Sequence, residues 1–221
     1  MKLKTPAGRG VPSHAVTRCQ LLEAGAEVFA EAGFRDATVR EICRQAGANV
    51  AAVNYHFGDK EKLYAEVLRF SQSRALEKYP PLLGVAADAL PEKKLRAFVQ
   101  SLLLRIFDKG PTAWHGKLML REMIEPTAAL DSLVEERVRP MASQLWQIVS
   151  EILDCPMNDE RVRLCGFSVV SQCVFYHHCR PIVSRLFPKQ GTPDAAAIER
   201  LTDHITKFSL AAMKHLSAVK H

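Results

Sequence analysis

Apolar residues recur at steps of three and four along almost the whole chain, and no stretch alternates apolar and polar residues between hairpin turn signals. This spacing predicts an all-α fold. With 221 residues, the chain has room for one large domain or two small ones. Charges interrupt every apolar run, as Arg105 does within residues 102–107, so we expect no membrane span. The amino end lacks the apolar segment of a secretory signal, and we therefore expect a cytoplasmic protein.

Cap and breaker residues divide the helical pattern into elements. The first expected helix covers about 13–32 and closes at the glycine of 32–34. Two short helices should follow within 38–57, and then a longer one over 59–79 that Pro80 and Pro81 stop. The remaining expected helices cover about 91–108, 114–124, 130–153, 158–179 and the stretch from 194 to the end, and Pro140 should kink or restart the third of these.

The segment 38–57 has the order helix, glycine turn, helix. Thr38 and Glu41 form a capping box, in which each side chain bonds the backbone amide of the other residue. Gly47 suits a tight turn, and Asn49 is an N-cap for the second short helix. Val53 and Phe57 should face inward, against the helix over 13–32. This arrangement is a helix-turn-helix signature.

The second short helix of such a unit enters the major groove of DNA, because a helix about 10 Å across fits a groove about 12 Å wide. The residues left outward are small or able to hydrogen bond, namely Asn49, Val50, Ala51, Asn54, Tyr55 and His56. Lys60 can reach the DNA backbone. A net charge of +6 also fits an anionic partner. The alternative is a packing element whose polar residues form a solvated face.

Residues 21–63 resemble the DNA-binding domain of the TetR family of bacterial repressors, and the resemblance rests on Phe29, 32–34, 37–39, Ile42, 46–47, 55–57 and 60–63. It implies that Tyr55, His56 and Lys60 contact phosphates. It also implies base-facing roles for Arg40, Val50 and Ala51, while Thr38 caps the helix that braces the recognition helix. Asn54 departs from the family pattern, which usually has a tyrosine there, so an amide able to touch a base stands where a phosphate contact is usual.

We divide the chain accordingly into three parts. Residues 1–12 form a disordered basic arm, because residues 1–22 hold basic side chains and no acidic ones. Residues 13–58 form the helix-turn-helix DNA-binding domain. Residues 59–221 form a helical effector-binding and dimerisation domain, which 59–79 connects to the DNA-binding domain.

The last expected helix has a seam that repeats every 3.5 residues through Ile198, Leu201, Ile205, Phe208, Ala212, His215 and Val219. The helix from 158 offers Phe167, Val174 and Phe175, with small residues between them. We expect these two helices and their symmetry mates to form a homodimer, as the last helices of TetR-like proteins do. Alternatively, both seams pack inside one subunit. A dimer also serves recognition, since two recognition helices about 34 to 36 Å apart read a palindromic operator in double-stranded DNA.

The carboxyl-terminal half resembles, more loosely, the TetR subgroup represented by the CerR and CecR regulators, through 121–122, 126–127, 139–140 and 175–181. The resemblance implies a repressor that a small, largely apolar effector releases from its operator. Residues suited to an effector pocket, although core packing explains them equally well, are Phe98, Leu102, Trp114, Met119, Arg121, Met123 and Trp146. Arg105, Arg121 and Glu122 lie in apolar sequence, where we expect them to pair with each other; otherwise they are poised for a polar group of a ligand.

One further cluster has metal-ligand chemistry: Cys165, Cys173, His177 and Cys179. Cys173 and His177 are four residues apart and share a helix face. The cluster supports an alternative function as a metal- or thiol-responsive regulator or a metalloprotein. Against it, no acidic residue of the kind that a hydrolytic site uses lies between Cys165 and Arg185. We expect no enzyme, no bound metal and no cofactor.

Overall fold

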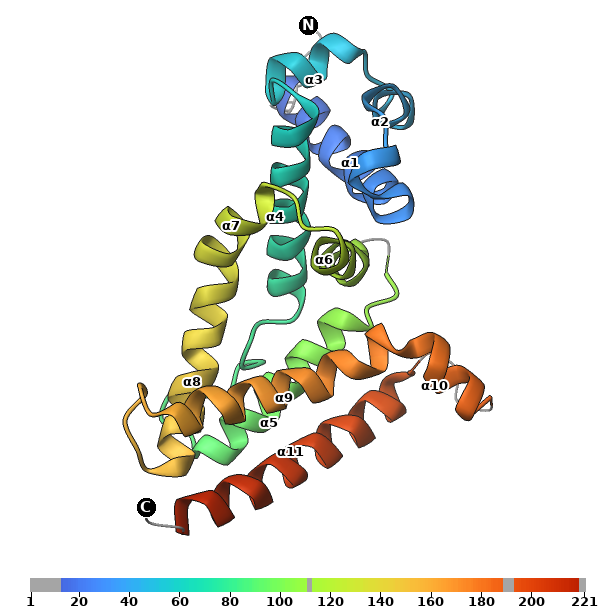
Figure 1. The fold of residues 1–221 in the computed structure, drawn as a ribbon. Helices are drawn as coiled ribbons and strands as arrows, with labels where there is room; N and C mark the ends of the chain where they lie inside the picture. The colour runs from blue at the N-terminus through green and yellow to red at the C-terminus, as the bar shows by residue number, and fades with distance from the viewer. Residues whose placement is uncertain (1–12, 111–112, 189–192, 219–221) are drawn as a thin grey trace, which may run out of the picture. The chain divides into compact units, whose positions relative to one another are not determined.

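The computed structural model describes residues 13–110, 113–188 and 193–218 (Figure 1). All regular structure in these three stretches is helical, which confirms the all-α prediction. The chain packs into two compact units that divide after Phe70, inside helix α4 (Lys60–Lys78). Among the helices described, none is long and apolar enough to cross a membrane. The predicted basic arm at 1–12 lies outside the described residues.

The first unit contains α1 (Ser13–Asp36), α2 (Val39–Ala46), α3 (Val50–His56) and the first part of α4. The predicted end of the first helix is a break at Gly33, whose φ of 81° lies in the left-handed region, and one more turn then runs on to Asp36. Phe29 is fully buried, with its ring centroid 4.8 Å from that of Tyr64 and 6.3 Å from that of Phe34. This aromatic cluster joins α1 to α4.

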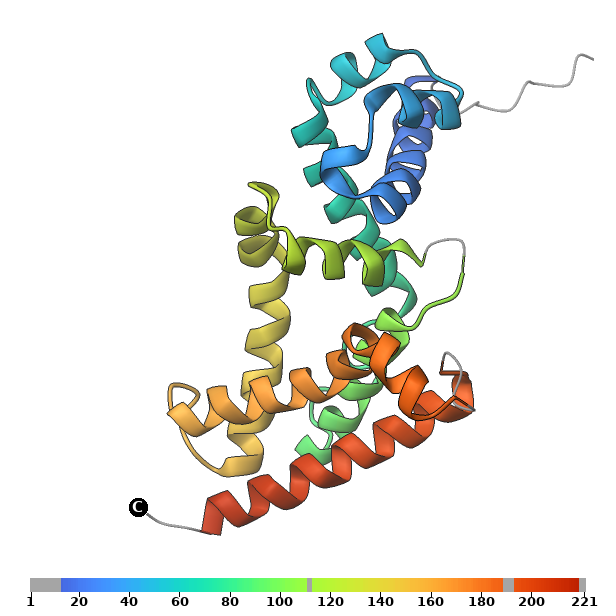
Figure 2. The ribbon, with the colours of Figure 1, turned by 45° about the vertical axis from the view of Figure 1, so that its right-hand side comes forward.

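The second unit contains the rest of the chain. Its elements are α5 (Pro91–Ile106), α6 (Trp114–Ile124), α7 (Ala129–Leu133), a π-helical turn η1 (Val134–Val138), α8 (Arg139–Leu153), α9 (Glu160–His178), α10 (Arg180–Leu186) and α11 (Ala195–Ala218). The main core lies among α5, α8, α9 and α11. Figures 1 and 2 show α9 and α11 running beside each other.

Helix ends in the second unit follow the predicted caps and breakers. The carboxylate of Asp159 accepts a hydrogen bond from the Arg161 amide at 2.9 Å, and that of Asp194 accepts one from the Ala197 amide at 2.7 Å. Pro140 lies in the first turn of α8, directly after the π-helical turn, so the predicted restart is confirmed. We did not expect α10, which begins beside Pro181, a residue suited to a first helical turn.

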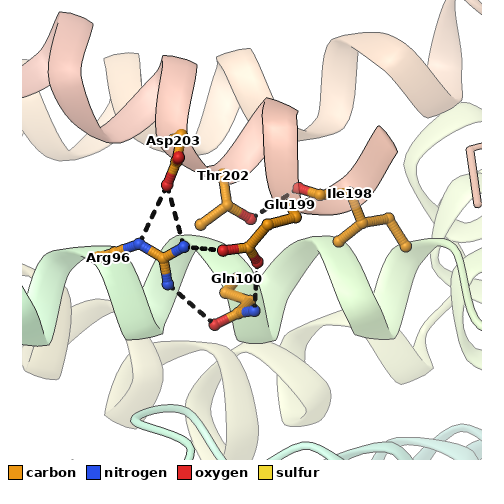
Figure 3. Close-up of polar contacts among 6 residues, drawn as sticks. All are labelled: Arg96, Gln100, Ile198, Glu199, Thr202 and Asp203. Atoms are coloured by element: carbon orange, nitrogen blue, oxygen red, sulfur yellow. Dashed lines mark hydrogen bonds and ion pairs between the residues drawn. The ribbon is translucent and has the colours of Figure 1, made fainter. Parts of the chain in front are cut away.

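Arg96 connects α5 to α11 within the subunit (Figure 3). Its guanidinium donates to the Asp203 carboxylate from Nε at 3.1 Å and from Nη2 at 2.9 Å, and it also pairs with Glu199. Gln100 donates to the second Glu199 oxygen at 2.9 Å. One face of α11 is therefore used inside the subunit.

Helix α6 approaches α5 at Gly116, where a Cβ would lie 2.8 Å from the backbone oxygen of Ile106. We expect Gly116→Ala to lower the free energy of unfolding by about 1–3 kcal/mol, because backbone on α5 cannot give way as a side chain could. Helix propensity alone would favour alanine by about 1 kcal/mol, so the sign of the change is informative. Urea unfolding measures it. Lys117→Ala, at an exposed neighbouring position, is the control, and an unchanged midpoint for Gly116→Ala would contradict the close approach.

Candidate nucleic-acid interface

Caps and a glycine turn hold α2 and α3 at a defined angle. Thr38 Oγ1 accepts a hydrogen bond from the Glu41 amide at 3.2 Å, and Asn49 Oδ1 accepts one from the Ala52 amide at 2.9 Å. Gly47 has a left-handed backbone with φ of 64°. The predicted caps and turn are thus confirmed. Only half of the capping box forms, because the Glu41 carboxylate pairs with Arg44 at 2.6 and 3.0 Å, and this hydrogen bonding lowers the pKa of Glu41.

The two sides of α3 have the predicted orientation. Val53 and Phe57 are buried in the first unit. Val50, Ala51 and Asn54 are exposed, and Tyr55 is 75% exposed. His56 is half-buried, with its ring in edge contact with Tyr55 at a centroid distance of 5.0 Å. The outward face of α3 is thus a short strip of small and hydrogen-bonding groups.

Two polar residues that flank this face, Asn49 and Lys60, already form hydrogen bonds within the first unit. Asn49 uses its amide oxygen as the cap of α3, so only its NH₂ group remains to donate to DNA. Lys60 Nζ donates to the backbone oxygen of Arg35 at 3.1 Å and lies 4.8 Å from the ring centroid of Phe34. A phosphate contact by Lys60 therefore requires it to exchange or share this bond. Arg40 is exposed on α2.

Arg18 has a structural role that its position in the sequence does not indicate. Its guanidinium lies 5.3 Å from the ring centroid of Phe57 and pairs with Glu66 at 2.5 Å. Arg18 thereby braces the end of α3 against α1 and α4. A helical step of three or four does not reveal such a contact, since Arg18 and Glu66 are 48 residues apart.

The predicted effector residues do not all share one environment. Phe98 belongs to the main core of the second unit, and Met123 is exposed on α6. Five others are half-buried: Leu102, Trp114, Met119, Arg121 and Trp146. Trp146 packs against α9, where a Cβ at Gly166 would lie 2.9 Å from its indole ring. The effector roles stay predictions.

The expected pairing of buried charges is wrong for Arg105. Its guanidinium bonds to the Ser101 backbone oxygen and to the Met141 sulfur, and it has no carboxylate partner among the residues described. Glu122 is fully buried and accepts hydrogen bonds from the amide and the hydroxyl of Thr127 at 2.8 and 2.9 Å.

The proposed interface residues fall into two groups. Phe167, Phe175, Phe208 and Ala212 are exposed on α9 and α11. Val174 and Leu201 are half-buried, and Ile205 is 1% exposed, in the core of its own subunit. Because α11 turns Ile198 and Ile205 toward α5 and α9, its apolar seam is divided between the subunit core and the surface. The Ile205 side chain is therefore not available to a second copy.

The cysteine and histidine cluster gives the alternative metal function no geometric support. In the part of the chain that the structure describes, no three histidine, cysteine or acidic side chains come together as a metal site. Cys165 and Cys173 are buried, and burial raises the pKa of Cys173 to about 12, so its thiol stays protonated.

Comparison with known proteins agrees with these two units. Residues 21–67 match bacterial regulatory proteins of the tetR family, and residues 91–213 match the C-terminal domain of the HTH-type transcriptional dual regulator CecR. CecR of Shigella flexneri is 30% identical over 165 residues, which cover 71% of this chain and 74% of that protein. The chain belongs to the TetR family of bacterial transcriptional regulators.

Solved structures agree with the TetR-family fold. A regulator from Pseudomonas aeruginosa PAO1 has a TM-score of 0.67 at 19% identity, covering 94% of this chain and 96% of its own. AibR, solved in complex with isovaleryl coenzyme A and operator DNA, has a TM-score of 0.64 at 16% identity, covering 87% of this chain and 97% of its own. As in the TetR family generally, this regulator has an amino-terminal helix-turn-helix followed by a helical domain and is a DNA-binding protein.

Proposed function

We propose that this TetR-family regulator is a repressor that binds a palindromic operator and leaves it when a small, largely apolar effector binds the carboxyl-terminal domain. The observation that carries the proposal is the outward face of α3. Its exposed residues can contact bases and phosphates, while Val53 and Phe57 anchor the helix from behind. We assign Arg40, Val50, Ala51 and Asn54 to base contacts, and Thr38, Asn49, Tyr55, His56 and Lys60 to backbone contacts or to positioning α3.

Operator binding requires a second copy, because one short recognition helix reads too few base pairs to be specific. We propose that Phe167, Phe175, Phe208 and Ala212 cover one another across a two-fold axis, with Val174 and Leu201 at the edge. Exposed phenylalanines on two adjacent helices support this interface, since a lone subunit leaves them in water.

Effector control would act as a population shift. The effector binds the DNA-incompetent arrangement of the dimer more tightly, and a differential affinity of about 1.4 kcal/mol changes operator occupancy tenfold. AibR, of the same fold, has been solved with a small molecule and operator DNA together, which supports an effector site in this fold. Helix α4 contributes residues to both units and is the proposed connection. The protein would act in the bacterial cytoplasm and would have no catalytic role.

Lys60→Ala tests the phosphate contacts. We expect it to weaken binding to operator and random duplexes alike and to reduce the slope of log K against log salt by about 1. Fluorescence anisotropy at several salt concentrations measures both, with an operator recovered by selection of bound duplexes from random and genomic pools. Lys62→Ala, an exposed neighbour that pairs with Asp59, is the matched control. An unchanged slope for Lys60→Ala would remove Lys60 from the phosphate contacts.

A protein that finds no preferred duplex in such a selection would overturn the proposed function as a whole. Specific regulators prefer their site over random DNA by about 10³–10⁷ in affinity, so the selection has a clear positive result. Loss of the selected duplex on adding an effector would identify a repressor released by that effector, and tighter binding would identify the opposite mode of control.

A further inference from the structure

Arg105 is a buried cation in the second unit. Arg105 is 2% exposed and lies on α5, which packs against α8 and α9. Nε donates to the Ser101 backbone oxygen at 3.2 Å, and Nη1 lies 2.9 Å from the Met141 sulfur, which is a weak acceptor. Nη2 is buried and has no hydrogen-bond partner among the residues described. A guanidinium this well buried is normally paired with a carboxylate.

Within the described ranges, no neighbouring group neutralises this charge. Burial lowers the pKa of Arg105 to about 10, which leaves the side chain charged at cellular pH. The charge of Arg105 favours the thiolate of Cys173, but burial has the larger effect and raises the pKa of Cys173 to about 12. Cys173 therefore remains a neutral thiol. The buried site therefore carries one positive charge.

A second unsatisfied group lies on α6, near the carboxyl end of α5. The Nδ1 atom of His115 is buried with no partner in the described part of the chain. Burial, followed by the charge of Arg105, lowers the pKa of His115 to about 4, so the imidazole is neutral at cellular pH. A neutral imidazole carries one N–H, and in the tautomer with that proton on Nδ1 this atom is a hydrogen-bond donor. A Cβ at its neighbour Gly116 would lie 2.8 Å from the Ile106 backbone oxygen, which places His115 near the carboxyl end of α5.

We propose that Arg105 and His115 receive the head group of a monoanionic amphiphile, a carboxylate with an apolar body, and that this is the effector. The inference rests on the proposed function and specifies its effector class. One positive charge, the unpartnered Nη2 donor of Arg105 and the Nδ1–H tautomer of His115 match a carboxylate, whereas a phosphate dianion would leave a negative charge uncompensated among apolar side chains. The apolar body packs among residues of α5, α8 and α9, where Met141 already lies against the guanidinium.

Matched eight-carbon probes test the head group on the full chain. Octanoate should bind at least about tenfold more tightly than octanol or octylamine, since a charge-assisted hydrogen bond forms only with the carboxylate. Titration calorimetry measures the affinities, and melting temperature should rise with octanoate concentration. Equal binding of the three probes, or tighter binding of octanol or octylamine, would overturn the proposal.

Variants on α5 separate a binding role for Arg105 from a structural one. Because Arg105 is charged and unpaired, Arg105→Met should melt no lower than the parent protein and should bind octanoate no better than octanol. Arg96→Met, on the same helix, removes a guanidinium that is paired with Glu199 and Asp203. It should melt lower and keep the octanoate preference. If Arg105→Met instead fails to fold or melts lower, Arg105 has a structural partner and the proposal is wrong.

His115→Phe should weaken octanoate binding severalfold. An unchanged octanoate affinity would remove His115 from the site.

The selected operator separates failure of this inference from failure of the proposed function. Octanoate that binds through Arg105 without changing operator affinity would keep the anion site but overturn its role as the effector site. Release of operator by octanol but not by octanoate would overturn the anion site and leave an effector-controlled repressor standing. Release by octanoate that Arg105→Met abolishes is the expected result.

Discussion

The double substitution Phe167→Glu and Phe208→Glu is expected to give a folded monomer that binds its operator at least about a hundredfold more weakly than the parent protein. The two side chains are already 56% and 60% exposed in the single chain, so glutamate costs an isolated subunit little. In a dimer the same positions would be covered. An unpaired carboxylate buried there opposes association by several kcal/mol.

Light scattering at micromolar concentration measures the mass, circular dichroism the helical content, and anisotropy the operator affinity. Ile124→Glu is the control, because Ile124 is also an exposed apolar residue but lies on α6. It should leave both dimer and DNA binding unchanged. The interface assignment fails if the double variant remains dimeric, and the need for a dimer fails if a monomer binds operator normally.

Phe29→Ala is expected to lower the free energy of unfolding of the first unit by about 3–5 kcal/mol. Phe29 is fully buried between α1 and α4, and its removal leaves a cavity beside Tyr64 and Phe34. Whole domains have only about 5–15 kcal/mol of stability, so the helix-turn-helix should open while the second unit stays folded. DNA binding should then be lost through disorder of α3.

Hydrogen exchange read out by peptide mass resolves the two units and so measures this local opening. The matched variant is Tyr55→Ala, at an aromatic residue that is 75% exposed on α3. It should change stability by no more than about 0.5 kcal/mol yet weaken DNA binding. If Phe29→Ala keeps native hydrogen-exchange protection in the first unit, the assigned core is wrong. If Tyr55→Ala loses that protection, Tyr55 has a structural role.

The helix-turn-helix could be predicted closely because its determinants are local. Thr38, Gly47 and Asn49 act on backbone groups four or fewer residues away, and each behaves as the sequence indicated. Val53 and Phe57 followed in turn from the period of one short helix. The structural context of Lys60 was less predictable, since its partner is the backbone of Arg35, 25 residues earlier.

Buried charge was harder to predict. Arg105 and Glu122 both occur in apolar sequence, where an ion pair between them is the simplest expectation. In the fold, Glu122 bonds to Thr127 after a turn, whereas Arg105 points to Ser101 and Met141. Spacing along the chain does not say which side chains of neighbouring helices meet. That Arg105 has no carboxylate partner in the described part of the chain became visible only in the structure.

The amino-acid sequence alone was enough to predict an all-helical chain, the capped helix-turn-helix and most helix ends. These features depend on contacts within one or two helical turns. The sequence could not decide how α11 faces its surroundings. Thr202 and Ser209 are buried while Phe208 is exposed, the reverse of what hydropathy favours. Steps of three and four produce two adjacent stripes on one helix, and only packing against α5 and α9 determines which stripe is covered within the subunit.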